Sequence, residues 1–167
     1  GAGIGGLSAA SCLMKAGFDV EIYEQAPELS EIGAGIQLSA NAMHVLNHLG
    51  LGDAIAKLSV RPGAYVFRLH NTGEIIGQFP LADEHERLNG APYNQLHRAD
   101  LHDVLAAKAR DFDKHVVRLN HRVVGFQENA TGVELHFADG SKAKGELLIG
   151  ADGVKSVVRA QIAGADH

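Results

Sequence analysis

Gly1-Ala2-Gly3-Ile4-Gly5-Gly6 opens the sequence and has the spacing Gly-x-Gly-x-x-Gly. In a nucleotide-binding turn of this spacing, the first glycine allows a sharp turn, the second lets backbone approach a pyrophosphate, and the third lets helix and strand pack closely. Apolar residues recur at helical spacing over residues 7–16, and the N-terminus of that helix would present free N–H groups to phosphates. The stretch therefore predicts the phosphate-binding turn of an α/β fold.

An acidic residue stands where such a fold binds an adenosine ribose. Glu24 ends a short predicted strand that contains Val20 and Ile22, and it lies 18 residues after Gly6. A carboxylate there can accept hydrogen bonds from both ribose hydroxyls and disfavours a 2′-phosphate, so it favours FAD or NAD over NADP. Because 20 of the 167 residues are glycine, the alternative is a glycine-rich structural turn.

Composition and charge exclude several classes of protein. The net charge of −5 argues against a nucleic-acid partner. The sequence contains no run of about 18 apolar residues, the length that a membrane-spanning helix needs. Cys12 is the single cysteine, so no intrachain disulfide forms, and we expect a reducing, cytoplasmic location. His44 and His48 share a helix face, but no third ligand is obvious, so we expect no metal.

Periodicity predicts short elements along the whole chain. The expected helices cover 7–16, a segment from a cap at Ser39 or Asn41 to Gly50, and 100–109. The expected strands cover 20–24, 65–69, 74–79, 116–119, 122–128, 132–137 and 144–149. Residues 33–36 and 82–92 are expected to form loops, the second a solvated charged surface. This order indicates a Rossmann-like α/β domain with a mixed sheet and a separate antiparallel β-meander layer.

A second motif, Gly150-Ala151-Asp152-Gly153, follows the apolar run 147–149. Asp152 and Gly153 would then stand at the carboxyl end of a strand, where ligands bind in open α/β sheets. Ser156 can cap the helix that follows, and Arg159 can fix the turn. Taken alone, the motif favours a surface strand-to-helix turn, since Asp-Gly is common in turns.

Four segments in order resemble the FAD-dependent aromatic hydroxylases, typified by para-hydroxybenzoate hydroxylase and salicylate hydroxylase. They are residues 1–6 with Glu24, residues 33–42 (GAGIQLSANA), residues 97–101 (HRADL) and residues 150–159 (GADGVKSVVR). The resemblance implies a glutathione-reductase-like FAD-binding domain, of which residues 1–167 form one part. Because such a domain needs a strand before its first glycine, we expect the sequence to be truncated at both ends, with most of the substrate-covering domain outside it.

The resemblance also implies a set of FAD-binding positions. They are Gly1, Gly3, Gly5, Gly6, Glu24, Gln25, Gln37, Arg98, Val123, Asp152 and Gly153. The glycines would hold the pyrophosphate, Glu24 and Gln25 the ribose, and Arg98 phosphate or ribityl oxygens. Backbone near Val123 would contact the adenine, and the Asp-Gly turn would serve both FAD and reduced nicotinamide. Gln37 would lie near the flavin ring, but glutamine cannot act as a base at neutral pH, so no catalytic residue is assigned.

The activity that the resemblance implies is aromatic hydroxylation. NADH or NADPH would reduce FAD, and O₂ would then form a flavin hydroperoxide that hydroxylates a small aromatic acid such as a hydroxybenzoate, salicylate or a hydroxynicotinate. The alternatives are another FAD oxidoreductase of the same fold, a reductase or an epoxidase, and a non-catalytic binding protein of the Rab GDP-dissociation-inhibitor kind. A homodimer is left open. We do not expect residues 1–167 alone to turn over.

Overall fold

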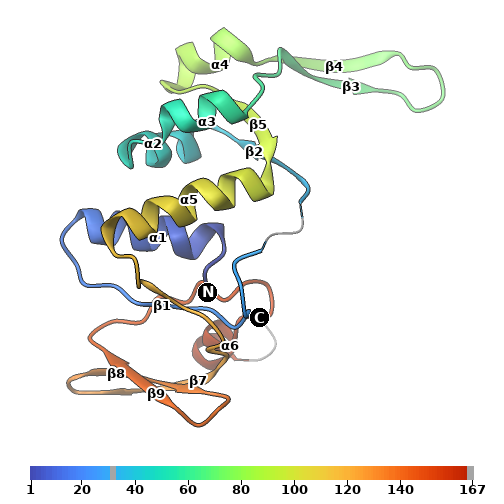
Figure 1. Cartoon of the computed structure of the whole chain (residues 1–167). Helices are drawn as coiled ribbons and strands as arrows, with labels where there is room; N and C mark the ends of the chain where they lie inside the picture. Colours follow the sequence, from blue (N-terminus) through green and yellow to red (C-terminus); the bar gives the residue numbers. More distant parts are fainter. Residues whose placement is uncertain (31–32, 165–167) are drawn as a thin grey trace. The chain divides into compact units, whose positions relative to one another are not determined.

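The computed structural model describes residues 1–30 and 33–164 (Figure 1). Contacts group the chain into two compact units. Unit 1 comprises Gly1–Ser30 with Leu105–His167, and unit 2 comprises Glu31–Val104. The helix α5, Arg98–Phe112, contains the boundary between them. That residues 1–167 form part of one domain stays a prediction.

Unit 1 begins with the expected helix and a parallel strand pair. The helix α1 covers Ile4–Lys15, so it starts inside the glycine-rich turn, and it buries Leu7 and Ala10. Gly17 has φ +92, a left-handed conformation that suits a glycine just after a helix. The strand β1, Ile22–Tyr23, then pairs in parallel with β6, Val117–Arg118.

The meander of unit 1 is a three-stranded antiparallel sheet. Its strands are β7 (Val123–Asn129), β8 (Gly132–Phe137) and β9 (Lys142–Gly145), in the order β7-β8-β9. Alternate residues of β8 are buried, as period-two patterning predicts. Gly132, the first residue of β8, and Gly140, in the turn before β9, both have positive φ.

The last predicted strand, 144–149, is wrong for its last four residues. The strand ends at Gly145, and the side chain of Leu147 is 76% exposed. Apolar character alone does not make a strand, because a strand needs a hydrogen-bonded neighbour. In the described part of the chain, no strand pairs with residues 146–149.

A helix near the end of unit 1 packs against the meander. This helix, α6, covers Val157–Ala163, and Val158 joins Phe126 and Val133 in a small apolar cluster. The Gln161 side chain also binds the backbone of Phe126. Its Oε1 accepts from the Phe126 N–H at 3.1 Å, and its Nε2 donates to the Phe126 carbonyl oxygen at 2.6 Å.

Unit 2 combines helices with two antiparallel strand pairs. Its elements are β2 (Gly35–Leu38), α2 (Ala40–His48), α3 (Gly52–Leu58), β3 (Ala64–Arg68), β4 (Ile75–Pro80), α4 (Ala82–Asn89) and β5 (Asn94–His97). The buried side chains include Met43, Leu46 and Leu49, the face predicted for α2, with Ser39 as N-cap. The predicted hairpin is β3–β4, which projects from the rest of unit 2 in Figure 1.

Two predicted loops of unit 2 are partly regular elements. Gly35 and Ile36 belong to β2, which pairs with β5, so a distant partner strand overrides the local signal of the glycines. Most of 82–92 is the helix α4, ended by Gly90 in the left-handed conformation. The charged residues of this segment resemble a polar loop in the sequence, but acids in the first turn and an ion pair between Glu84 and Arg87 favour an exposed helix.

The expected mixed sheet is distributed over separate small sheets. The structure assigns the described strands to the parallel pair β1-β6, the antiparallel pairs β2-β5 and β3-β4, and the meander. Parallel and antiparallel pairing both occur, in different sheets.

Candidate functional site

The phosphate-binding turn separates its glycines into two kinds. A Cβ on Gly6 would lie well under 3.0 Å from the Gly1 carbonyl oxygen, and a Cβ on Gly1 equally close to the Ala151 carbonyl oxygen. Those two glycines are therefore required by packing. A Cβ on Gly3 or Gly5 would have no other described atom within 4 Å. This open side of the turn has room for a ligand.

Gly3 is the N-cap of α1 and has an extended backbone, with φ −73 and ψ 179. It has no side chain to occupy the first-turn N–H groups, which have no partner inside a helix. Those N–H groups and the helix dipole favour an anion at this end. The open glycine side of the turn and the helix end are thus suited to a pyrophosphate.

Glu24 holds this turn through its carboxylate. Its Oε2 accepts from the Ala2 N–H at 2.7 Å, and its Oε1 accepts from the Ala26 N–H at 2.9 Å. A carboxylate can accept about four hydrogen bonds, so both oxygens keep capacity for ribose hydroxyls. The side chain is half-buried, and the neighbouring Gln25 is exposed. Sequence reasoning anticipated a ligand role for Glu24 but not its hold on the backbone of the turn.

The Asp-Gly turn lies against the first glycines. A Cβ on Gly1 would be 3.5 Å from the Asp152 Cα, so the structure brings together two motifs from opposite ends of the sequence. Gly153 has φ +79, a conformation that glycine adopts without the strain of a Cβ. It is exposed.

The Asp152 carboxylate serves the turn itself. It accepts hydrogen bonds from Ser156 Oγ at 2.5 Å and from the N–H groups of Val157 and Val158 at 2.7 and 3.1 Å. Burial alone would raise the pKa of Asp152, but these hydrogen bonds outweigh it and hold the pKa below its ordinary value. A ligand at this turn would therefore meet backbone groups and Gly153, while Asp152 stays occupied with α6.

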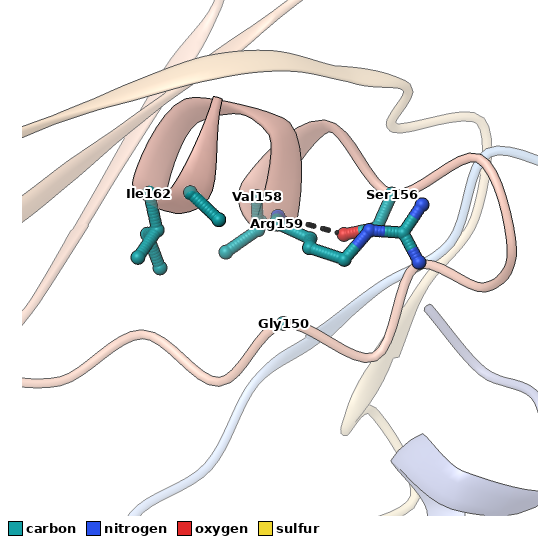
Figure 2. A pocket seen from close by; sticks show the side chains of 6 residues that line it. Gly150, Ser156, Val158, Arg159 and Ile162 are labelled. Carbon is teal, nitrogen blue, oxygen red and sulfur yellow. Dashed lines mark hydrogen bonds between the residues drawn. The ribbon is translucent and has the colours of Figure 1, made fainter. Parts of the chain in front are cut away.

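Ser156 and Arg159 have the roles predicted from the sequence. Ser156 is the N-cap of α6, and its Oγ accepts from the Arg159 N–H at 2.9 Å, drawn as the dashed line in Figure 2. The Arg159 guanidinium donates to the Val154 carbonyl oxygen at 2.7 Å. A shallow pocket runs between α6 and Gly150, lined on the helix side by Val158 and Ile162.

Val123 begins β7 beside a break in the ladder. Val123 pairs with Phe137, but the register shifts between Val123 and Gly125, as in a β-bulge. The shift leaves Val124 out of the ladder, so backbone groups near Val123 are presented irregularly. This is the position at which the family resemblance implies backbone contacts to an adenine.

Gln37 and Arg98 belong to unit 2. Gln37 is exposed on β2, opposite Gln95 of β5, and its Oε1 accepts from the Tyr65 hydroxyl at 2.6 Å. Arg98 begins α5 directly after β5, and its backbone N–H donates to the Ala34 carbonyl oxygen at 2.9 Å. The segments predicted to bind flavin in unit 2 are thus joined through the β2–β5 pair.

Two tyrosines next to Gln37 were missed from the sequence. The hydroxyls of Tyr65 and Tyr93 are hydrogen-bonded to each other. Burial raises the pKa of Tyr93 to about 12, and the bond to Tyr65 adds to the rise. The alternating pattern of residues 65–69 marks Tyr65 only as part of a hairpin, and nothing local to Tyr93 marks it, so the pairing depends on the fold.

Residues 1–165 match the model of a family described as the FAD binding domain. The chain belongs to this FAD-binding domain family. Its cofactor is FAD, and the expected α/β fold is confirmed. Among residues 1–30 and 33–164, no group of three or more potential metal ligands occurs, and no helix is long and apolar enough to cross a membrane.

Relatives of this FAD-binding domain include named monooxygenases. A 3-amino-4-hydroxybenzoate 2-monooxygenase from Streptomyces cremeus is 44% identical over 162 residues, covering 97% of this chain and 40% of that protein. A 3-hydroxybenzoate 6-hydroxylase from Polaromonas naphthalenivorans is 40% identical over 164 residues, covering 98% and 41%. The crystal structure of Klebsiella pneumoniae HpxO with FAD and uric acid matches with a TM-score of 0.82 at 36% identity, covering 96% and 40%. The chain therefore spans about 40% of the length of these relatives.

Proposed function

We propose that the protein is an FAD-dependent monooxygenase that hydroxylates a small aromatic acid, with NADH or NADPH as reductant. The observation that supports it most directly is the match over 97% of the chain to a hydroxybenzoate monooxygenase at 44% identity. A second relative, at 40% identity, is also named for a hydroxybenzoate. A hydroxybenzoate or a related hydroxylated aromatic acid is therefore the substrate class that we propose.

The balance of the reaction defines what the protein has to do. One O₂ and one NAD(P)H with a proton yield one hydroxylated ring, one water and NAD(P)⁺. FAD supplies the chemistry that joins the reductant to O₂. The chain's own residues have to bind FAD, orient it and keep water from the reacting centre.

Unit 1 has the groups to bind the adenosine diphosphate part of FAD. We assign the pyrophosphate to the N–H groups at the start of α1 and to the open side of Gly3 and Gly5. Glu24 would accept the ribose hydroxyls with the capacity left on its carboxylate, beside Gln25. Backbone near the irregular pairing at Val123 would contact the adenine.

Further flavin contacts would come from the Asp-Gly turn and from unit 2. The exposed Gly153 and the backbone of its turn would approach FAD and the reduced nicotinamide, because Asp152 is engaged with α6. Arg98 would contact phosphate or ribityl oxygens, and Gln37 would contact the flavin ring or the substrate beside it. A homodimer and a cytoplasmic location stay predictions.

The test uses the purified full-length protein. We expect it to retain FAD and to oxidise NADH or NADPH faster when 3-hydroxybenzoate, 3-amino-4-hydroxybenzoate or salicylate is added, with a hydroxylated product by mass spectrometry. Product that equals the NAD(P)H consumed supports a monooxygenase. FAD-dependent NAD(P)H oxidation without hydroxylated product from any aromatic acid would instead favour a reductase, and absence of flavin would favour a non-catalytic binding protein.

A further inference from the structure

A row of hydrogen bonds ends at an exposed side chain of unit 2. The Tyr93 side chain is buried, only 6% exposed, and its hydroxyl is bonded to that of Tyr65 on β3. The Tyr65 hydroxyl also contacts Gln37 Oε1 on β2 at 2.6 Å. Three separate segments are thus joined through the Tyr65 hydroxyl.

The aromatic rings around Tyr65 hold its hydroxyl in place. The rings of Tyr65 and Tyr93 meet edge to face, with centroids 5.6 Å apart and an interplanar angle of 76°. The ring of Phe67 also lies beside that of Tyr65, with centroids 6.4 Å apart, and it contacts the ring of Phe79. Aromatic pairs favour particular ring geometries, so these two neighbouring rings restrict the orientation of the Tyr65 ring.

The number of hydroxyl protons decides which group donates in each of the hydrogen bonds between Tyr93, Tyr65 and Gln37. A phenol has a single O–H, and the Tyr65 proton is directed to the carbonyl oxygen of the Gln37 amide. Tyr65 can therefore only accept from Tyr93, which donates. Because the pKa of Tyr93 is raised to about 12, Tyr93 remains a protonated donor at neutral pH.

This direction determines what Gln37 can offer to a ligand. Tyr65 takes one of the two lone pairs of Oε1 and holds that oxygen on its own side, so the Nε2 group with its two N–H donors is turned away from Tyr65. Gln37 is exposed, and its backbone is held opposite Gln95 in the β2–β5 ladder. A ligand on the Nε2 side of this amide has to present an acceptor.

We propose that Tyr93 and Tyr65 are positioning residues that orient the Gln37 amide with its N–H groups toward the ligand, and that Gln37 thereby recognises an acceptor oxygen. The inference rests on the proposed function for the two ligands that carry such an oxygen. One source is the carboxylate or phenolate of the aromatic acid, and the other is a carbonyl of the flavin ring.

Four variants of the full-length protein separate orientation from simple packing. Gln37→Glu replaces the two N–H donors of the amide by a carboxylate oxygen, and Tyr65→Phe leaves the Gln37 amide free to rotate by 180°. Gln37→Lys offers donors only, so its binding no longer needs Tyr65. The double variant Gln37→Lys/Tyr65→Phe completes the cycle. Tyr23→Phe is the matched control, because the Tyr23 hydroxyl also bonds an acceptor, Glu21 Oε2 at 2.5 Å, but in unit 1.

Two binding constants are measured without turnover. The Kd for FAD comes from flavin fluorescence on titration of the apoprotein, and the Kd for 3-hydroxybenzoate from the change in flavin absorption. We expect Gln37→Glu to raise one of the two constants by at least 30-fold and Tyr65→Phe by about 5- to 10-fold. Tyr23→Phe should change neither by more than 2-fold. The constant that rises tells which ligand supplies the oxygen.

The double-mutant cycle of Gln37→Lys and Tyr65→Phe distinguishes orientation of the Gln37 amide from a merely structural role of Tyr65. In the Gln37→Lys background, Tyr65→Phe should change that Kd by less than 2-fold. An equal loss in both backgrounds, or Kd values for Gln37→Glu within 2-fold of the wild type, would overturn the inference while leaving the proposed function intact. A wild-type protein that binds neither FAD nor any aromatic acid would refute both.

Discussion

Replacing Gly3 by alanine should separate cofactor binding from folding. The backbone of Gly3 has φ −73, which alanine adopts without strain, and its Cβ would meet no other described atom within 4 Å. Loss of glycine freedom in the unfolded chain stabilises by about 0.4–1 kcal/mol. Alanine is a poorer N-cap residue than glycine, and this destabilises the variant by a similar amount, on the order of 0.5 kcal/mol or more. The free energy of unfolding of the Gly3→Ala apoprotein should therefore lie within about 0.5 kcal/mol of the wild-type value.

FAD binding should respond quite differently. A methyl group at Gly3 would occupy the space assigned to the pyrophosphate and keep it from the first N–H groups of α1. Loss of one hydrogen bond to a charged group corresponds to about 1.5–3 kcal/mol, or roughly 10- to 150-fold in Kd. The assays are urea denaturation of the full-length apoprotein and FAD titration by fluorescence quenching.

Gly6→Ala is the matched variant on the packed side of the turn. Its Cβ would lie well under 3.0 Å from the Gly1 carbonyl oxygen, so the turn or α1 has to move. Overpacking of this kind costs about 1–3 kcal/mol, and we expect that loss in the apoprotein itself. If Gly3→Ala binds FAD with the Kd of the wild type, the pyrophosphate does not lie at the open side of this turn, and our placement is refuted.

Three further substitutions test other parts of the candidate site. Glu24→Ala should weaken FAD binding and also lower the urea midpoint of the apoprotein, because the Ala2 and Ala26 N–H groups lose their acceptor; an unchanged midpoint would show that Glu24 does not hold the turn. The pKa of Asp152 is lower in the folded protein than its value of about 3.9 in the unfolded chain, so its carboxylate stabilises the fold above that pH and loses this effect as pH falls through the folded value. The melting temperature of Asp152→Asn should therefore depend less on pH below about 4 than that of the wild type. Arg98→Lys should weaken FAD retention on gel filtration, because lysine lacks the planar fork of donors, and full retention would exclude a bidentate flavin contact.

Local chemistry was sufficient to predict several elements. The helix after the glycine turn, its end near Gly17, the β3–β4 hairpin and the Ser156 cap each depend on residues within one turn or a few positions. Hydrophobic period, positive φ and capping act at that range, so a single sequence reports them well.

Features that depend on distant partners could not be predicted from the sequence. The glycines of 33–36 indicated a loop, but pairing with β5 makes Gly35 and Ile36 part of a strand. The apolar run 147–149 indicated a strand, yet no described strand pairs with it. Glu24 was assigned to a ligand from its spacing, while its bond to Ala2 depends on where the fold places the turn. The contact between Tyr65 and Tyr93 has the same origin.

The hold of Gln161 on β7 has a consequence for how this protein avoids self-association. The strand β7 is at the edge of its sheet, and an edge strand presents unpaired backbone groups that can recruit another chain. The single amide of Gln161 occupies both the N–H and the carbonyl of Phe126, near the middle of the strand. An incoming strand would have to displace it and lift α6 from the apolar cluster. Gln161 thereby keeps the two backbone groups of Phe126 from pairing with another strand at this edge.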